Sequence, residues 1–169
     1  AKGSVVSVFG RIQTNYYKSG TGSGGMVNVA RVTGILEGLR NREEIKINEE
    51  LFSIYEAWEK EHPFDKGVGW GAEPWSQEEM EVTEEIAKNA ATKSDIAVVI
   101  LGRTAGEDQD NQLKEGSYLL TKTEMELLRQ VRNAFSKMVV VLNVGNIIDM
   151  SFEDEIKPDA ILYAWQGGM

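Results

Sequence analysis

The sequence predicts an α/β fold in three layers, with a doubly wound and mainly parallel sheet of about five strands between helices. The first observation is the run Ile-Ala-Val-Val-Ile-Leu over residues 96–101, which contains no polar residue. An unbroken apolar run is typical of a strand with both faces buried, as in a parallel sheet. The second observation is that short β-rich runs alternate along the chain with segments of helical spacing. This alternation is the order that builds a parallel sheet with crossover helices.

Five segments are expected to form the strands, because each is short and rich in β-branched or aromatic residues. They are residues 4–9, 43–47, 96–101, 138–142 and 159–165. Helices are expected between them, where apolar residues recur every three or four positions. The spacing predicts helices over residues 26–40, 49–61, 76–92 and from 123 to about 135, with a helical turn within 148–156.

Capping residues mark the starts of three of these helices. Asn48 precedes the second helix, while residues 76–79 and 123–126 both match the capping-box pattern Ser/Thr-x-x-Glu. In a capping box the two side chains satisfy backbone N–H groups that have no partner within the helix. The pair His62-Pro63 is expected to end the second helix, because proline cannot continue it.

The composition excludes several classes of protein. The chain carries a net charge of −9 at pH 7, and it offers no basic cluster that could bind nucleic-acid phosphates. It contains no cysteine, so it forms neither a disulfide framework nor a thiolate metal site. No apolar run approaches the roughly 18 residues of a membrane span. The length of 169 residues is that of one domain, and both ends look cut from something longer.

A polar loop follows the apolar run over residues 96–101, and we expect the chemistry of the chain there. Gly102 and Gly106 bracket the start of the loop, and carboxylates follow at Glu107, Asp108 and Asp110. Open α/β sheets bind their ligands at the carboxyl ends of the parallel strands. A lone loop glutamate is more often solvated, and a retaining glycosidase needs a second carboxylate about 5 Å away. The residues by themselves identify no such partner for Glu107.

Two loop motifs resemble nucleotide and calcium sites without meeting their requirements. Residues 20–25, Gly-Thr-Gly-Ser-Gly-Gly, match G-x-G-x-x-G, but a dinucleotide site needs these glycines directly after a strand. No Lys-Ser or Lys-Thr follows them, which excludes a P-loop and favours a flexible loop over the sheet edge. Residues 108–112 resemble the start of a calcium loop, but Leu113 occupies the position that requires glycine.

The aromatic residues and the histidine of the loops have two interpretations each. Trp70 and Trp75 flank a Gly-Pro loop, where exposed rings could stack on a sugar, although loop tryptophans are more often packing anchors. His62 is the single histidine and has no partners for a metal site or a catalytic triad. We therefore expect it to be a surface residue at the end of a helix.

Several segments, in this order along the chain, resemble the second domain of glycoside hydrolase family 3. The longest is residues 94–108, Ser-Asp-Ile-Ala-Val-Val-Ile-Leu-Gly-Arg-Thr-Ala-Gly-Glu-Asp. The others are the glycine loop 20–25, Tyr118-Leu119-Leu120 leading to Glu124, Val-Val-Val-Leu-Asn over 139–143, and Ala-Trp-Gln-Gly-Gly-Met over 164–169. The resemblance covers nearly the whole chain and implies an α/β sandwich with a six-stranded sheet, so that five to six strands are expected in all.

The resemblance also implies an activity and a partner domain. In the family this domain packs against a (β/α)8 barrel that supplies an aspartate nucleophile, and the sugar binds at the seam. The implied reaction is retaining hydrolysis of O-glycosides of the β-glucosidase type, with Glu107 as the acid/base and with no cofactor or metal. Arg103 and Asp110 are weaker candidates for positioning the loop or the sugar. Ser23 of the glycine loop and the aromatic Trp70 are further candidates for sugar contact.

Two departures and two alternatives accompany this hypothesis. The barrel and its nucleophile are absent, and the family continues past Gln-Gly-Gly-Met with a further helix, so we expect a fragment with essentially no turnover by itself. One alternative is a non-catalytic carbohydrate-binding or interdomain scaffold, which requires Glu107 to face solvent or to form a structural ion pair. The other is a nucleotide-binding regulatory domain, which requires glycine-loop amides converging at a helix N-terminus.

Overall fold

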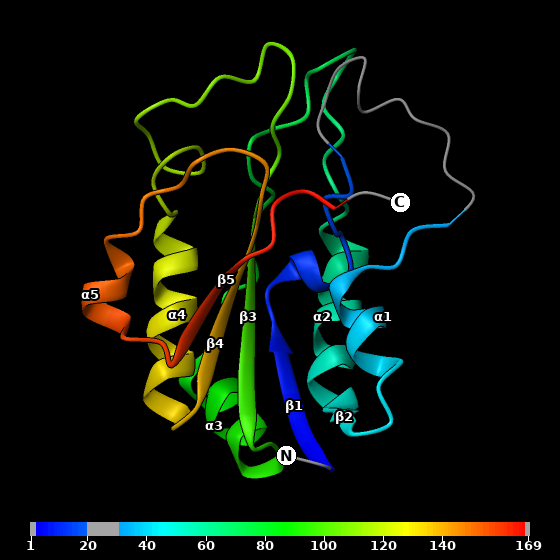
Figure 1. Ribbon diagram of the computed structural model, residues 1–169, viewed down its shortest axis with the longest axis vertical. Helices are drawn as coiled ribbons and strands as arrows, with labels where there is room; N and C mark the ends of the chain where they lie inside the picture. Colours follow the sequence, from blue (N-terminus) through cyan, green and yellow to red (C-terminus); the bar gives the residue numbers. More distant parts are fainter. Residues whose placement is uncertain (1–2, 20–30, 168–169) are drawn as a thin grey trace.

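The sheet has five strands over the described residues, and every neighbouring pair of strands runs parallel (Figure 1). The computed structural model describes residues 3–19 and 31–167. In order across the sheet the strands are β2 (Ile45–Ile47), β1 (Ser4–Phe9), β3 (Ile96–Arg103), β4 (Met138–Val144) and β5 (Ala160–Tyr163). The strand order reverses beside β1, which is the arrangement of a doubly wound sheet. The predicted α/β class is confirmed.

Helices lie on both faces of the sheet (Figure 1). The larger apolar core includes side chains from α2 (Glu49–Glu61), α3 (Glu84–Lys93), α4 (Lys122–Ala134) and α5 (Phe152–Ile156). A smaller core includes Leu36 from α1 (Ile35–Arg40). In β3, Val99 and Leu101 belong to the larger core and Ile100 to the smaller one. Successive side chains of a strand point to opposite faces, so burial on both faces explains the unbroken apolar run.

The first helix is much shorter than the spacing predicts. Residues 26–30 of the expected helix lie outside the described part of the chain, and residues 31–34 are not helical. Helix α1 begins only at Ile35, after Gly34, which provides no side-chain cap. Glycine is a poor helix former, and a Cβ at Gly34 would lie 3.4 Å from the Cβ of Tyr16. The apolar spacing at Val32 therefore does not belong to this helix.

The helix expected over residues 76–92 begins eight residues later, at Glu84, with Thr83 as its N-cap. The capping box predicted at residues 76–79 is wrong, because its glutamate binds elsewhere. Glu79 is buried, and its Oε1 and Oε2 accept hydrogen bonds from the backbone N–H of Arg11 at 3.2 and 3.0 Å. The Glu79 Oε1 atom also accepts one from the N–H of Met80. These tertiary contacts hold the segment in a non-helical conformation.

The capping box of α4 lies two residues earlier than predicted. Thr121 is the N-cap, and its side chain and that of Glu124 exchange hydrogen bonds with each other's backbone N–H. Both Thr121–Glu124 and Thr123–Glu126 match the pattern, and only the first also places a carboxylate beside Arg103. The cap predicted at Asn48 is confirmed, since its Oδ1 accepts a hydrogen bond from the N–H of Leu51 at 3.3 Å.

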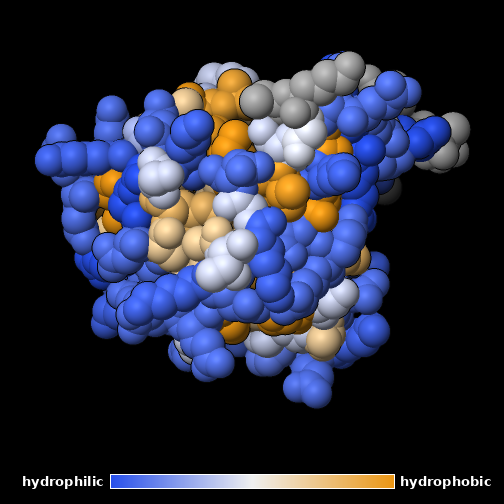
Figure 2. Space-filling view, turned by 90° about the horizontal axis from the view of Figure 1, so that it is seen from below, coloured by the Kyte–Doolittle hydropathy of each residue, from blue (hydrophilic) through white to orange (hydrophobic). Residues whose placement is uncertain are grey.

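The two ends of the sheet differ in character. Seen from below, where the strands begin, hydrophobic residues gather in patches between hydrophilic ones (Figure 2). Loops gather at the opposite end, above the carboxyl ends of the strands (Figure 1). Of the helices in the described ranges, none combines the length and the apolar character needed to cross a membrane. The candidate residues that the structure describes all belong to the loop end.

Candidate active site

The ends of three strands are joined by one buried side chain at the carboxyl edge of the sheet. Asn143, near the end of β4, accepts a hydrogen bond through Oδ1 from the N–H of Tyr17 at 2.7 Å. Its Nδ2 donates to the carbonyls of Tyr17 at 3.0 Å and Trp165 at 2.7 Å. Tyr17 follows β1 and Trp165 follows β5, so one amide fixes the relative positions of the segments that leave these strands. This edge is therefore a rigid base for the loops above it.

Glu107 lies on the loop that follows β3, in a tight turn. The N–H of Gln109 donates to the carbonyl of Gly106 at 3.2 Å, which closes the turn around Glu107 and Asp108. Asp108 has a left-handed φ of 61°, a conformation that aspartate tolerates better than most residues. The Glu107 side chain is exposed in the chain by itself. It is thus free to reach a ligand or another domain at this edge.

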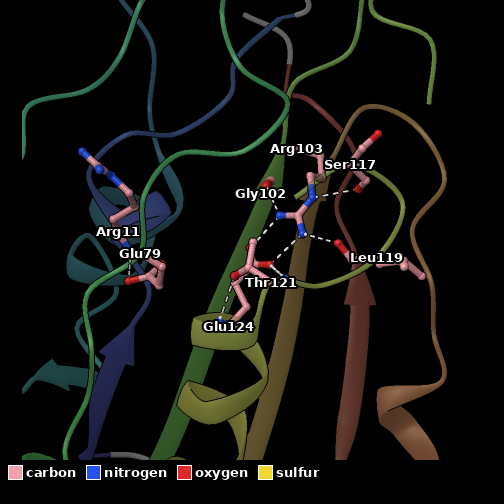
Figure 3. A network of polar contacts seen from close by, with 8 residues as sticks. All are labelled: Arg11, Glu79, Gly102, Arg103, Ser117, Leu119, Thr121 and Glu124. Atoms are coloured by element: carbon pink, nitrogen blue, oxygen red, sulfur yellow. Dashed lines mark hydrogen bonds and ion pairs between the residues drawn. The ribbon is translucent and has the colours of Figure 1, made fainter. Parts of the chain in front are cut away.

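Arg103 is buried at the base of the same loop and uses all of its donors within the protein. Only 2% of the residue is exposed. Its guanidinium donates to both carboxylate oxygens of Glu124, at 2.6 and 2.7 Å, in a bidentate ion pair (Figure 3). The other donations go to the carbonyls of Ser117, Gly102 and Leu119. Arg103 therefore joins β3, the return of the loop and the start of α4, and it has no donor left for a sugar.

A second loop lies beside the Glu107 turn. It connects α2 to the extended segment before α3 and carries Trp70. The side chain of Gln109 donates to the carbonyls of Gly71 at 2.6 Å and Glu73 at 3.0 Å. The N–H of Thr104 donates to the carbonyl of Trp75 at 2.8 Å. The residues that these hydrogen bonds join are about thirty or more positions apart in the sequence. The two loops are therefore neighbours only in the folded chain.

The remaining predicted site residues are placed as follows. Trp70 is 57% exposed and precedes Gly71, so its ring belongs to the loop that contacts the Glu107 turn. Asp110 is exposed on the Glu107 loop. Ser23 and the glycine loop 20–25 lie outside the described residues. Four of the five candidates thus belong to one end of the sheet, although Arg103 lies beneath the surface.

Trp75 and His62 have structural contacts. The ammonium of Lys114 lies 4.0 Å from the centre of the Trp75 ring, which is half-buried. His62 ends α2, stacks on Trp58 and pairs with Glu78. These contacts match the expected roles of a packing anchor and a helix terminator. Across the described ranges, no group of three or more His, Cys, Asp or Glu side chains is arranged to hold a metal ion.

The loops at this edge expose large apolar side chains. Val68 is 98% exposed, and other exposed side chains follow β3, β4 and β5: Leu113, Ile147 and Trp165. Together with Trp70 they form what we call the apolar rim. Exposed apolar side chains that cluster on one side of a protein indicate an interaction surface.

Burial raises the pKa of three groups at or below this edge. Burial, and next the nearby Asp65 carboxylate, raise the pKa of Glu73. Burial, and next the charge of Glu73, raise the pKa of Tyr17. Farther down, burial raises the pKa of Glu79 to about 8, although two backbone N–H groups oppose the shift. Perturbed groups of this kind are common beside functional sites but also occur in structural networks.

Two residues at this edge were not singled out as functional by the sequence patterns. Gln109 is only 8% exposed although it lies in a polar loop, and nothing in its neighbourhood in the sequence predicts that burial. Asn143 did carry a signal, because it is the only strongly polar residue in the segment 138–144. A polar residue at the end of a buried strand must find hydrogen-bond partners, which are most easily reached at the sheet edge.

Comparison with known proteins decides the family. The Glycosyl hydrolase family 3 C-terminal domain matches residues 1–169, the whole chain. The chain belongs to this family. A beta-glucosidase from Ruminococcus albus is 61% identical to it over 168 residues, which are 99% of this chain and 18% of that protein. The family that the motifs resemble is therefore confirmed.

Solved structures agree with this assignment. The beta-glucosidase of Paenibacillus barengoltzii has a TM-score of 0.95 and 50% identity over 99% of this chain and 19% of its own. Beta-glucosidase 3B of Thermotoga neapolitana, solved in complex with glucose, has a TM-score of 0.85 and 28% identity over 99% of this chain and 24% of its own. The family 3 domain described here thus spans about a fifth of the length of these relatives.

Proposed function

We propose that this chain is the C-terminal α/β domain of a longer, retaining β-glucosidase-like enzyme and that Glu107 is its general acid/base. The observation that carries the proposal is the exposed Glu107 carboxylate, held in a closed turn at the carboxyl edge of the sheet. Two relatives at 61% and 50% identity are beta-glucosidases. The role of Glu107 is assigned from its position in the family's motif together with this geometry.

The reaction proceeds in two displacements. In the first, an aspartate of the barrel attacks the anomeric carbon, and the Glu107 carboxyl gives its proton to the departing glycosidic oxygen. In the second, the Glu107 carboxylate removes a proton from water, and the water oxygen replaces the aspartate on the anomeric carbon. Glu107 thereby regains its proton, and two inversions leave the configuration of the sugar unchanged. Neither step needs a metal or an organic cofactor.

The barrel is proposed to dock on the loop end of the sheet and to complete the sugar site. The apolar rim supplies contact area for this partner, because its exposed side chains belong to loops at the same end of the sheet as Glu107. Trp70, Asp110 and Ser23 are the proposed contributors to sugar binding. Arg103 acts by holding the loop, since its five donors are occupied within the protein. The chain by itself lacks the nucleophile and is proposed to be inactive.

The test uses the full-length enzyme with the substitution Glu107→Ala. The turnover of a β-glucoside with a poor leaving group should fall by about 10²–10⁴-fold, because the glycosidic oxygen must be protonated as it departs. With an aryl β-glucoside that has a good leaving group, the rate of the first step should fall less. Azide should restore turnover, and the product should be a glycosyl azide of retained configuration. Glu115→Ala, on an exposed position of the same loop, is the matched control and should retain activity.

The exposure of Glu107 also favours a second candidate, a non-catalytic interdomain scaffold. A carboxylate that faces solvent in the chain by itself is what that hypothesis requires. The same experiment separates the two functions. If Glu107→Ala cleaves both substrates at the wild-type rate, the acid lies elsewhere in the enzyme and this domain is a scaffold.

A further inference from the structure

Gln109 is the one side chain of the Glu107 turn that is anchored in the body of the protein. The turn exposes Glu107 and Asp108, whereas Gln109 is 8% exposed. Both donations of the Gln109 amide go to backbone carbonyls of the second loop, those of Gly71 and Glu73. Because a primary amide has only two N–H donors, the whole donor capacity of Gln109 is used to join the two loops.

The backbone of Gln109 closes the turn that carries Glu107. Its N–H donates to the carbonyl of Gly106, the residue directly before Glu107. The side chain of Gln109 therefore binds the second loop, while its backbone binds the turn that carries Glu107. A shift of Gln109 away from the second loop must move the backbone of Glu107 with it.

The second loop is itself fixed, so Gln109 binds to a firm support. The side chain of Gln77 accepts from the N–H of Asp65 at 2.7 Å and donates to its carbonyl at 2.8 Å, which pins the start of the loop. Its end is pinned by the hydrogen bond from Thr104 to the carbonyl of Trp75. Gly71 has a φ of +67°, and a Cβ there would lie 3.9 Å from the carbonyl oxygen of Glu107, so the two backbones are close.

We propose that Gln109 is a positioning residue that joins the Glu107 turn to the Trp70 loop and thereby sets the place of the Glu107 carboxylate. The inference rests on the proposed function of Glu107 and goes beyond it. A general acid must lie within hydrogen-bond reach of the leaving oxygen, and a displacement of about 1 Å can cost roughly 10²-fold in rate. Gln109 supplies this precision through the hydrogen bonds of its side chain and without touching the substrate.

The first experiment follows hydrogen–deuterium exchange in the full-length enzyme carrying Gln109→Ala. Peptides from both loops, around residues 104–110 and 68–75, should exchange several-fold faster than in the wild type. Gln109→Glu keeps the size of the side chain and replaces the donating nitrogen with an acceptor, so it should have the same effect without creating a cavity. Gln112→Ala is the matched control, because Gln112 is exposed on the same loop and its side chain makes no hydrogen bond with the described residues. If neither loop or only one loop responds to Gln109→Ala, the proposed coupling is overturned.

The second experiment measures kcat and KM of the full-length enzyme with the same variants. Gln109→Ala should lower kcat/KM about 10–100-fold for a poor leaving group and clearly less for a good one. Azide should give no rescue, because the Glu107 carboxylate is still present. Simple loss of folded enzyme lowers the measured kcat/KM equally for both substrates, so an equal loss would overturn the positioning role. Glu107→Ala tests the function of Glu107 separately: if it has no effect while both loops loosen in Gln109→Ala, the acid/base proposal fails and the coupling of the loops stands.

Discussion

The base and the tip of the Glu107 loop are held by different kinds of contact. At the base, the Arg103 guanidinium is buried and forms a bidentate pair with Glu124 and three hydrogen bonds to carbonyls (Figure 3). At the tip, one neutral side chain, Gln109, makes two hydrogen bonds to another loop. Breaking a buried ion pair leaves an uncompensated charge, whereas breaking a neutral loop contact near the surface does not. The base is therefore expected to contribute more to stability, and the tip can be changed at little cost to the fold.

A parallel difference separates two buried carboxylates beside the base. Glu124 faces the guanidinium of Arg103 at 2.6 Å. Glu79 accepts only backbone N–H groups, and burial raises its pKa to about 8. Backbone dipoles satisfy the hydrogen bonds of a carboxylate but compensate its charge less completely than a cation at the same distance. Glu79 therefore keeps its proton to a higher pH than an ordinary carboxyl group.

The largest expected effect is at the base. Arg103→Ala leaves the Glu124 carboxylate buried without its cation and three carbonyls without their donor, so it should lower the free energy of unfolding by about 3–5 kcal/mol. Urea unfolding of the 169-residue chain, followed by tryptophan fluorescence, measures the loss. Arg129→Ala is the control, because Arg129 pairs with Glu155 on the surface, where an ion pair contributes roughly 0–1 kcal/mol. Equal losses in the two variants would contradict the special role of the buried pair.

Glu79 should make stability depend on pH. Its pKa in the folded chain is about 8, and an unfolded glutamate has a pKa of about 4.3. Between these values the folded chain holds a proton that the unfolded chain has lost, so the free energy of unfolding should fall as the pH rises, by about 3–4 kcal/mol between pH 5 and pH 8. Unfolding curves at about pH 5 and pH 8 measure the slope, and Glu79→Gln should flatten it. An unchanged slope in the variant would assign the pH dependence to other groups.

Asn143→Leu should have the next largest effect. It removes the amide that joins the segments after β1, β4 and β5 and leaves the buried N–H of Tyr17 unpaired, which should cost about 2 kcal/mol. The midpoint of urea denaturation measures this loss against Asn133→Leu on the exposed face of α4. If the variant is as stable as this control, the strand ends are held by packing alone.

The smallest effect on stability is expected at the tip. Gln109→Ala should lower the free energy of unfolding by about 1 kcal/mol or less, because its carbonyl partners belong to loops that water can enter. The same urea titration tests this value. A loss as large as that of Arg103→Ala would show that tip and base are one unit, and the contrast between them would disappear.

The sequence predicted the elements whose pattern is local and strong. The strand at residues 96–101 was recognised from its apolar run, and α2 from its spacing and its Asn48 cap. Predictions failed where a local pattern had a competing tertiary partner. The box at residues 76–79 matches a capping motif, but Glu79 binds the N–H of Arg11, far away in the chain. Patterns of neighbouring residues cannot predict a partner that is distant along the chain.

The class of the fold, the family and the loop on which Glu107 lies can all be predicted from the order of the residues. These depend on hydrophobic periodicity and on short ordered motifs, which neighbouring residues carry. Three features emerge only in the folded chain: Arg103 is buried below the Glu107 turn, Glu124 is its partner, and Gln109 joins the Glu107 turn to the Trp70 loop. Such contacts link segments that are distant along the chain, and they form because parallel strands bring their carboxyl ends to one edge of the sheet. Their geometry therefore follows from the packed fold and not from any local pattern of residues.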